Sequence, residues 1–327
     1  MPVDPGTDRI RCALIGDGIT ASFTPPMHER EGAAHGLDYR YDVIDLERRG
    51  LSVDDLPELI AAARRDGLRG LNITHPCKQA VIPLLDDLSP EARDLGSVNT
   101  VLFEKGRSIG HNTDWSGFGR NLAAGLPDAD TGRVVQLGAG GAGSAVAYAA
   151  LRLGTRRLDI VDADRARALA LAARLAALFP ERVVRGTERD AAPDLIATAD
   201  GLIQATPVGM AHHPGSPVDT DLLRPDLWVA EVIYRPLETV LLTAARAIGA
   251  PVVDGTGMAV GQAVDAFRIF TGLEPDPARM RAHVAELVEK ELAAQSARQE
   301  SAAESAGQGS AAGESGMQEG DSDAAAV

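Results

Sequence analysis

The sequence predicts an α/β fold arranged in two domains, and two observations support this prediction. Short apolar runs, which are typical of buried strands, alternate with stretches whose apolar residues recur at helical spacing. A second series of this alternation begins at the glycine-rich stretch Gly138–Gly143, which follows an apolar run and precedes a helical pattern. The 327 residues are enough for two hydrophobic cores.

The first domain is expected over residues 1–122. Strands are predicted at 11–16, 39–46 and 68–73, followed by a hairpin at 98–103 and 108–110. Helices are predicted at 24–36, 56–65, 78–85, 89–96 and 116–122. Thr24 is the expected N-cap of the first helix because prolines follow it, and Asp114 is a candidate N-cap of the last helix.

The second domain is expected over residues 123–255. Its predicted strands are 134–137, 158–162, 201–206, 227–234 and 252–253, and its predicted helices are 144–153, 165–178 and 238–248. Helices at 257–270 and 277–294 form a C-terminal segment, residues 256–294, that is expected to pack back on the first domain. Residues 295–327 contain no aromatic side chain and are expected to form a disordered acidic tail.

The stretch Gly138-Ala139-Gly140-Gly141-Ala142-Gly143 matches the GxGxxG pattern, which is weak support when it stands alone. Here a strand precedes it, a helix follows it, and Asp162 ends the next strand about 20 residues downstream, which completes the dinucleotide-binding fingerprint. Such glycines let backbone amides approach a pyrophosphate at a helix N-terminus. We therefore favour a Rossmann-type dinucleotide site over a purely structural glycine turn.

Asp162 indicates which dinucleotide is bound. A carboxylate at this strand end accepts hydrogen bonds from both hydroxyls of the adenine ribose and repels a 2′-phosphate. Arg165 and Arg167 follow in the next helix and could receive that phosphate, which leaves the alternative open. The sequence predicts NAD as the cofactor in preference to NADP.

Lys78 is the residue at which we place the chemistry. It follows the predicted strand 68–73, after a break at Pro76, and opens a helical pattern. Small-molecule sites form at the carboxyl ends of such strands, and a lysine there can act as an acid or base. The alternative is a solvated lysine at the start of a helix.

Composition excludes several functional classes. A formal charge of −15 argues against nucleic-acid binding, and no apolar run approaches the length of a membrane span. The N-terminus lacks an apolar signal region, so a cytoplasmic location is expected. Cys12 and Cys77 form neither a disulfide framework nor a metal-ligand pattern, and we expect both to pack and no metal to bind. A monomer or homodimer is expected.

The following motifs occur in order along the chain: Ser22-Phe23-Thr24-Pro25, Asn72 to Lys78, Val98-Asn99-Thr100, Asn112-Thr113-Asp114, Gly138 to Gly143, Ala205 to Met210, and Gly257-Met258 with Gln262-Ala263. In these motifs and their order, from about Arg11 to Arg281, the chain resembles the shikimate dehydrogenase family, most closely the actinobacterial quinate/shikimate dehydrogenases. Jointly these motifs are highly specific.

The resemblance implies a role for each matching residue. Lys78 and Asp114 match the family's catalytic pair. The positions matching its substrate-binding residues are Ser22, Thr24, Thr74, Lys78, Asn99, Asp114, Tyr234 and Gln262. The positions matching its cofactor-binding residues are Gly138, Ala139, Gly140, Gly141, Ala142, Gly143, Asp162, Arg167, Thr206, Val208, Met210, Val232 and Gly255.

The implied activity is NAD-dependent oxidation of the C3 hydroxyl of quinate, shikimate or both. The alternatives are a biosynthetic NADP-dependent shikimate dehydrogenase and a catalytically silent sensor of these acids. Thr24 favours quinate use, because biosynthetic members usually have serine there. Cys77, Gly261 and the turn Gly16-Asp17-Gly18 depart from the family pattern, which leaves the substrate preference open.

Overall fold

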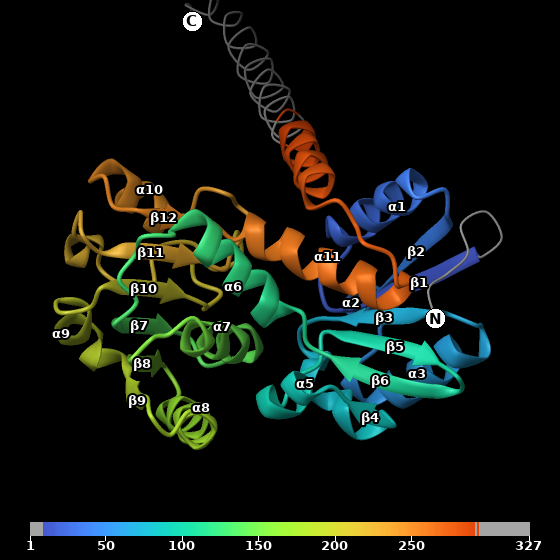
Figure 1. Ribbon diagram of the computed structural model, residues 1–327, viewed down its shortest axis with the longest axis horizontal. Coiled ribbons are helices and arrows are strands. Elements are labelled where there is room, and N and C mark those ends of the chain that lie inside the picture. The colour runs from blue at the N-terminus through green and yellow to red at the C-terminus, as the bar shows by residue number, and fades with distance from the viewer. Residues whose placement is uncertain (1–8, 292, 294–327) are drawn as a thin grey trace, which may run out of the picture. The chain divides into compact units, whose positions relative to one another are not determined.

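The computed structural model describes residues 9–291 and residue 293 (Figure 1). Of these, the residues up to Arg281 belong to one compact unit, which carries every element discussed below, and the residues from Ala282 onward belong to a second. Helical backbone runs over residues 277–291. The tail predicted at 295–327 lies outside the described residues.

The first lobe of the unit is built on a mixed sheet with the strand order β2-β1-β3-β5-β6-β4. β1 pairs in parallel with both β2 and β3, whereas β5 is antiparallel to β3 and forms a hairpin with β6. The strands are β1 (Arg9–Gly16), β2 (Asp38–Asp45), β3 (Gly70–Ile73), β4 (Asp87–Leu88), β5 (Thr100–Glu104) and β6 (Arg107–His111).

Both faces of the first sheet are buried, as the alternation along β1 shows. Ala13 and Ile15 pack on one face with α3, whereas Ile10, Cys12 and Leu14 pack on the other. The helices that follow these strands are α1 (Thr24–Ala34), α2 (Leu46–Arg49), α3 (Leu56–Arg65), α4 (Cys77–Ala80), α5 (Pro90–Leu95) and α6 (Asp114–Gly125). Short 3-10 turns lie at Val53–Asp55 and Ile82–Leu84.

The second lobe is built on a parallel sheet with the strand order β12-β11-β10-β7-β8-β9. Its elements are β7 (Arg133–Leu137), α7 (Gly141–Arg152), β8 (Arg157–Asp162), α8 (Arg165–Leu178), β9 (Val183–Glu188), α9 (Ala192–Ile196), β10 (Gly201–Gln204), β11 (Trp228–Glu231), α10 (Val240–Ala247) and β12 (Val252–Val253). The strand order reverses at β7, between β8 and β10, and such a switch point opens a crevice at the carboxyl ends of the strands.

Helix α11 (Thr256–Thr271) returns to the first lobe (Figure 1). Its Phe267 and Phe270 pack in the cluster that holds Ile10 and Cys12. Gly261 lies where α11 crosses α6, because a Cβ on Gly261 would stand 2.7 Å from Gly117 Cα. The glycine that departs from the family pattern therefore permits a close helix crossing. The predicted α/β fold is confirmed, with a Rossmann-type domain and a helix, α11, that returns to the first lobe.

Several predicted element boundaries are wrong. Thr24 is the first residue of α1 rather than its N-cap, because Phe23 already has helical backbone angles. Asp114 likewise is the first residue of α6, whose N-cap is Thr113. The edge strand β9 was not predicted, because its side chains are at most half-buried and its sequence lacks a continuous apolar run.

Within the described part of the chain, no helix is long and apolar enough to cross a membrane. Over the same residues, no group of three or more His, Cys, Asp or Glu side chains could hold a metal ion.

Candidate active site

Lys78 and Asp114 form a direct ion pair in the first lobe. Lys78 Nζ lies 2.7 Å from Asp114 Oδ2, and the two side chains are 17% and 8% exposed. α4 carries Lys78, and the first residue of α6 is Asp114. Because both partners are largely removed from water, their attraction is screened far less than that of a surface pair.

Asn99 holds the other oxygen of Asp114. The backbone amide of Thr113 donates to Asn99 Oδ1 at 2.8 Å, and a backbone N–H can only donate. This bond fixes the orientation of the amide, so Asn99 Nδ2 donates to Asp114 Oδ1 at 2.9 Å. Lys78 and Asn99 therefore grip the carboxylate from two sides.

A buried polar chain supports Asn99 from behind. Asn72 Nδ2 donates to Thr100 Oγ1 at 3.0 Å, and Thr100 Oγ1 donates to Asn99 Oδ1 at 2.9 Å. Tyr41 donates its hydroxyl hydrogen to Asn72 Oδ1, and burial raises the pKa of Tyr41, so the hydroxyl keeps its proton. We did not predict roles for Tyr41 and Asn72. The available signal was one polar residue inside the apolar run Leu71-Asn72-Ile73.

The loop of residues 18–24 carries Ser22 and Thr24. Asp45, at the end of β2, accepts hydrogen bonds from the backbone amides of Gly18, Ile19 and Thr20 at 3.3, 2.9 and 3.1 Å. Burial alone would raise the pKa of Asp45, but hydrogen bonds from Thr20 and from backbone amides lower it below its ordinary value. The start of this 18–24 loop is thus anchored within its own lobe.

Ser22 and Thr24 are linked to each other. Ser22 Oγ accepts a hydrogen bond from the Thr24 backbone amide at 3.2 Å, and Ser22 N donates to Ile19 O at 3.0 Å. The Ser22 hydroxyl therefore accepts from the first amide of α1, whose N-cap, Phe23, makes no side-chain cap hydrogen bond. Both hydroxyls stand on one short turn, an arrangement that can bind two oxygens of one carboxylate.

The remaining predicted substrate residues come from three other elements. Thr74 follows β3 and crowds Gly16, where a Cβ would stand 2.3 Å from Thr74 Cγ2. Gln262 lies on α11 close to the α6 crossing, and its Nε2 donates to Ala259 O at 3.1 Å. Tyr234 follows β11, with its ring centroid 6.3 Å from that of Phe23. The structure joins Lys78, Asp114 and Asn99 by direct bonds and brings the other residues from separate elements.

The glycine turn fits the diphosphate of a dinucleotide. Gly143 must lack a side chain, because a Cβ there would stand 2.3 Å from Gly138 O. α7 begins after Gly140 without a side-chain cap, and a Cβ on Gly140 would meet no atom within 4 Å. The first amides of α7 therefore have no side-chain cap, and the space beside Gly140 is open, which suits an anionic ligand. A Cβ on Gly141 would lie 3.6 Å from Lys78 Cδ, which places the turn beside the ion pair.

Asp162 braces this glycine turn. Its Oδ2 accepts from Ala139 N at 2.7 Å, and its Oδ1 accepts from Asp164 N at 2.8 Å. Arg167 reaches both acids, with Nη1 3.9 Å from Asp162 Oδ1 and Nη2 3.8 Å from Asp164 Oδ2. Arg167 is 57% exposed, but it already faces two carboxylates.

Two buried glutamines, which sequence reasoning missed, shape the loops at the carboxyl edge of the second sheet. Gln136 Nε2 donates to the carbonyls of Gly138 and Gly143, both at 2.8 Å. Gln204 Nε2 donates to Val208 O at 2.7 Å, and its Oε1 accepts from Thr206 N at 3.0 Å. Each is a single polar residue near the end of an apolar strand.

The buried side chain of Glu231 shapes the loop that follows β11. Its Oε1 accepts from Ile233 N at 3.0 Å, and its Oε2 accepts from Thr239 Oγ1 at 3.1 Å. Burial raises the pKa of Glu231 to about 7. Gly255 packs against the same loop, since a Cβ there would stand 2.4 Å from Val232 O. Val232 and Gly255, both predicted cofactor residues, are therefore adjacent, whereas Met210 is 40% exposed on its own loop.

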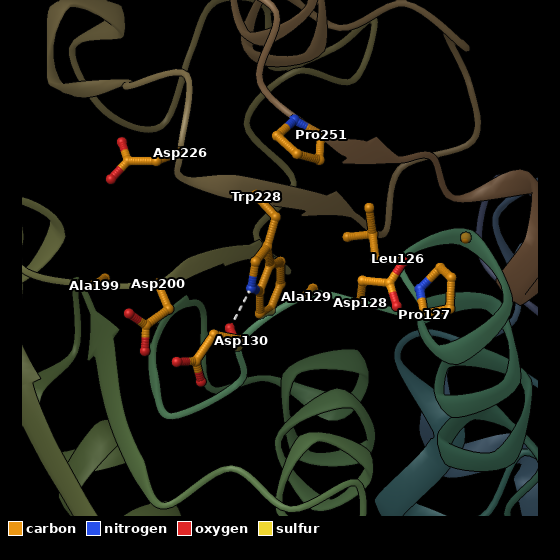
Figure 2. Close-up of a pocket in the computed structure, with 11 residues that line it drawn as sticks. Leu126, Pro127, Asp128, Ala129, Asp130, Ala199, Asp200, Asp226, Trp228 and Pro251 are labelled. Atoms are coloured by element: carbon orange, nitrogen blue, oxygen red, sulfur yellow. Dashed lines mark hydrogen bonds between the residues drawn. The ribbon is translucent and has the colours of Figure 1, made fainter.

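A hollow of about 430 Å³ lies at the opposite edge of the second sheet (Figure 2). Trp228, the first residue of β11, lines it and donates its indole N–H to Asp130 O at 2.8 Å. Ligands of open parallel sheets bind at the carboxyl ends of the strands, and this hollow lies at the amino ends. It is separate from the site around Lys78.

Comparisons with known proteins agree with this geometry. The family model for the shikimate dehydrogenase substrate binding domain matches residues 14–101, and the one for the shikimate 5′-dehydrogenase C-terminal domain matches residues 255–285. A shikimate dehydrogenase (NADP(+)) of Pseudarthrobacter chlorophenolicus is 56% identical over 288 residues, which cover 88% of this chain and 98% of that protein. A quinate/shikimate dehydrogenase (NAD(+)) of Corynebacterium efficiens is 52% identical over 276 residues, which cover 84% of this chain and 97% of that protein.

Solved structures give the same result. The quinate dehydrogenase of Corynebacterium glutamicum in complex with NAD superposes with a TM-score of 0.81 and 49% identity, covering 85% of this chain and 99% of that one. The resemblance predicted from the motifs is thereby confirmed. This chain belongs to the shikimate dehydrogenase family of NAD(P)-dependent oxidoreductases.

Proposed function

We propose that the protein oxidises the C3 hydroxyl of quinate or shikimate with NAD, forming 3-dehydroquinate or 3-dehydroshikimate. The observation that carries the proposal is the Lys78–Asp114 pair at 2.7 Å, held beside the glycine turn. Bound NAD supplies the hydride acceptor. The protein supplies the proton transfer and the orientation of the substrate.

Lys78 and Asp114 remove the hydroxyl proton as a unit. Lys78 Nζ passes a proton to Asp114 Oδ2 and takes the proton of the substrate hydroxyl, so an ammonium group remains beside the new carbonyl oxygen. Asn99 keeps Asp114 oriented during the transfer, since its Nδ2 already donates to Oδ1. The intact pair argues against a catalytically silent sensor.

The other predicted residues bind the substrate. Ser22 and Thr24 donate their hydroxyls to its carboxylate, and Thr74, Asn99, Tyr234 and Gln262 pair with the ring hydroxyls. Hydroxyls that stay unpaired on burial cost free energy, which explains a polar lining of Thr, Asn and Gln. We infer that the methyl of Thr24 borders the substrate carbon that is tetrahedral in quinate and flat in shikimate, and one such group changes discrimination by about 1–3 kcal/mol.

The preference for NAD rests on Asp162. Its carboxylate ends β8 and is held against the glycine turn by Ala139 N, the position from which an acid reaches both ribose hydroxyls. Arg167, which could receive a 2′-phosphate, is shared by Asp162 and Asp164. The proposed cofactor residues further along the chain are Thr206, Val208, Met210, Val232 and Gly255.

A biosynthetic NADP-dependent shikimate dehydrogenase is the second candidate. It is favoured by the name of the Pseudarthrobacter relative and by the exposed Arg167. The discriminating experiment measures initial rates for quinate and for shikimate with NAD and with NADP. In each assay the other reactant is present at a saturating concentration. We expect the highest kcat/KM with NAD. A preference for NADP would reject our interpretation of Asp162 and favour the biosynthetic enzyme.

A further inference from the structure

Arg235 links the two lobes at the 18–24 loop. It follows β11 in the second lobe, and its Cζ lies 4.8 Å from the centroid of the Phe23 ring in the first lobe. Its Nη1 also donates a hydrogen bond to Ala21 O. One side chain of the nucleotide-binding lobe thus makes two different contacts with the turn that carries Ser22 and Thr24.

These contacts complete the support of that turn. Asp45 holds Gly18, Ile19 and Thr20, which covers only the beginning of the 18–24 loop. Arg235 contacts Ala21 and Phe23, the residues that alternate with the two hydroxyl-bearing positions. The backbone around Ser22 and Thr24 is therefore held from its own lobe on one side and from the opposite lobe on the other.

The chemistry of these contacts requires a guanidinium group. A planar guanidinium can stack on an aromatic ring while one of its N–H groups donates a hydrogen bond to an acceptor beside that ring. An ammonium group is a point charge and lacks this planar geometry. Holding two hydroxyls in place before the substrate arrives removes an entropy cost from binding. This entropy cost belongs to the step in which the protein binds the carboxylate of the substrate.

We propose that Arg235 is a positioning residue that aligns the Ser22 and Thr24 hydroxyls with the carboxylate of the substrate, acting through Ala21 and Phe23. The inference rests on the proposed function, in which those hydroxyls bind that carboxylate. It adds a residue of the nucleotide-binding lobe to the determinants of acid recognition. Arg235 thereby couples substrate affinity to the contact between the lobes.

The test compares Arg235→Met and Arg235→Lys with the wild-type protein. Both variants lose the stacked, donating fork, so the KM for quinate and shikimate should rise about fivefold to twentyfold in each. The kcat should stay within about twofold, and NADH should bind with unchanged Kd in a fluorescence titration. Arg189→Met is the matched control, because Arg189 Nη2 also donates to a backbone carbonyl, that of Pro217 at 3.1 Å.

A methyl ester of shikimate separates positioning from a general structural effect. If Arg235 acts through the carboxylate-binding hydroxyls, Arg235→Met should raise the KM of the acid by a much larger factor than the KM of the ester. Phe23→Leu, which removes the stacking partner, should reproduce the result in a second variant. Wild-type KM in Arg235→Lys, or an equal penalty for acid and ester, would overturn the inference. Absence of turnover by the wild-type protein would instead overturn the proposed function, and the inference with it.

Discussion

Replacing Glu231 by glutamine should stabilise the second lobe in a pH-dependent manner. The carboxylate is 1% exposed, and its environment raises the pKa from an ordinary 4.5 to about 7. In the Glu231→Gln variant, the amide oxygen can still accept from Ile233 N, and the amide nitrogen can donate to Thr239 Oγ1. The substitution therefore removes the charge while keeping both hydrogen-bonded neighbours of the loop.

The sign and size of the effect follow from the pKa. Between pH 4.5 and about 7 the folded protein holds a proton on Glu231 that the unfolded chain has lost, so this carboxyl makes the free energy of unfolding fall as the pH rises. Above about pH 7 the folded protein carries the full free-energy penalty of a charged, buried Glu231. A pKa difference of this size corresponds to a penalty of about 3 kcal/mol. Below pH 4.5 the penalty is absent.

His28 works in the opposite direction in part of this range. Burial lowers the pKa of His28 to about 3. Between about pH 3 and 6.5 the unfolded chain therefore holds a proton on His28 that the folded protein does not. Stability from this group is lost as the pH falls through 6.5. The pH profile of the wild-type protein alone therefore mixes opposing contributions from several groups, and only the difference between Glu231→Gln and wild type isolates Glu231.

The assay is guanidinium denaturation followed by the fluorescence of Trp228, which lies on the same strand as Glu231. Trp115→Phe serves as the common background, because Trp115 is the other tryptophan of the chain. At pH 8 the free energy of unfolding of Glu231→Gln in this background should exceed that of the background alone by about 3 kcal/mol. The pH-dependent part of this difference should disappear at pH 4.5. A difference that is constant from pH 4.5 to 8 would show that Glu231 ionises normally, and the reasoning would be refuted.

Three further substitutions test the site and its surroundings. Lys78→Ala should lower kcat by about a hundredfold or more while KM changes less than tenfold, because the lost group acts mainly in the transition state, and Lys105→Ala is the control; an unchanged kcat would remove Lys78 from the mechanism. Asp162→Ser should lower kcat/KM with NAD by about tenfold and raise it with NADP by freeing Arg167, and Asp164→Ser, which keeps an N-cap on α8, should change the ratio less. Ser97→Ala should raise the free energy of unfolding by about 1 kcal/mol, because the buried Ser97 hydroxyl has no hydrogen-bond partner among the described residues. Ser144→Ala should lower it, since Ser144 Oγ accepts from Arg174 and donates to Leu95 O; a loss of stability in Ser97→Ala would contradict this account.

Local sequence was sufficient to predict the elements that have a strong repeating pattern. The apolar run before Gly138, the glycines that follow and Asp162 at the next strand end determined the Rossmann-type lobe, because each feature depends on only a few neighbouring residues. The ordered motifs around Lys78 and Asp114 were likewise sufficient for the family. Edge strand β9 and the exact starts of α1 and α6 were not predictable, since an exposed edge carries no continuous apolar signal and a cap depends on backbone angles.

The motifs had already linked Lys78 with Asp114, and tertiary structure decided which other polar side chains hold this pair. Lys78 and Asp114 lie 36 positions apart, and only the pairing of β3 with β5 brings Asn72 and Asn99 behind them. The link from Arg235 to Ala21 spans 214 positions and joins two lobes. Hydrogen bonds act over about 3 Å in space and carry no signature of their separation along the chain. Sequence therefore determined the fold and the chemical groups, and the packing of the strands determined how those groups are held.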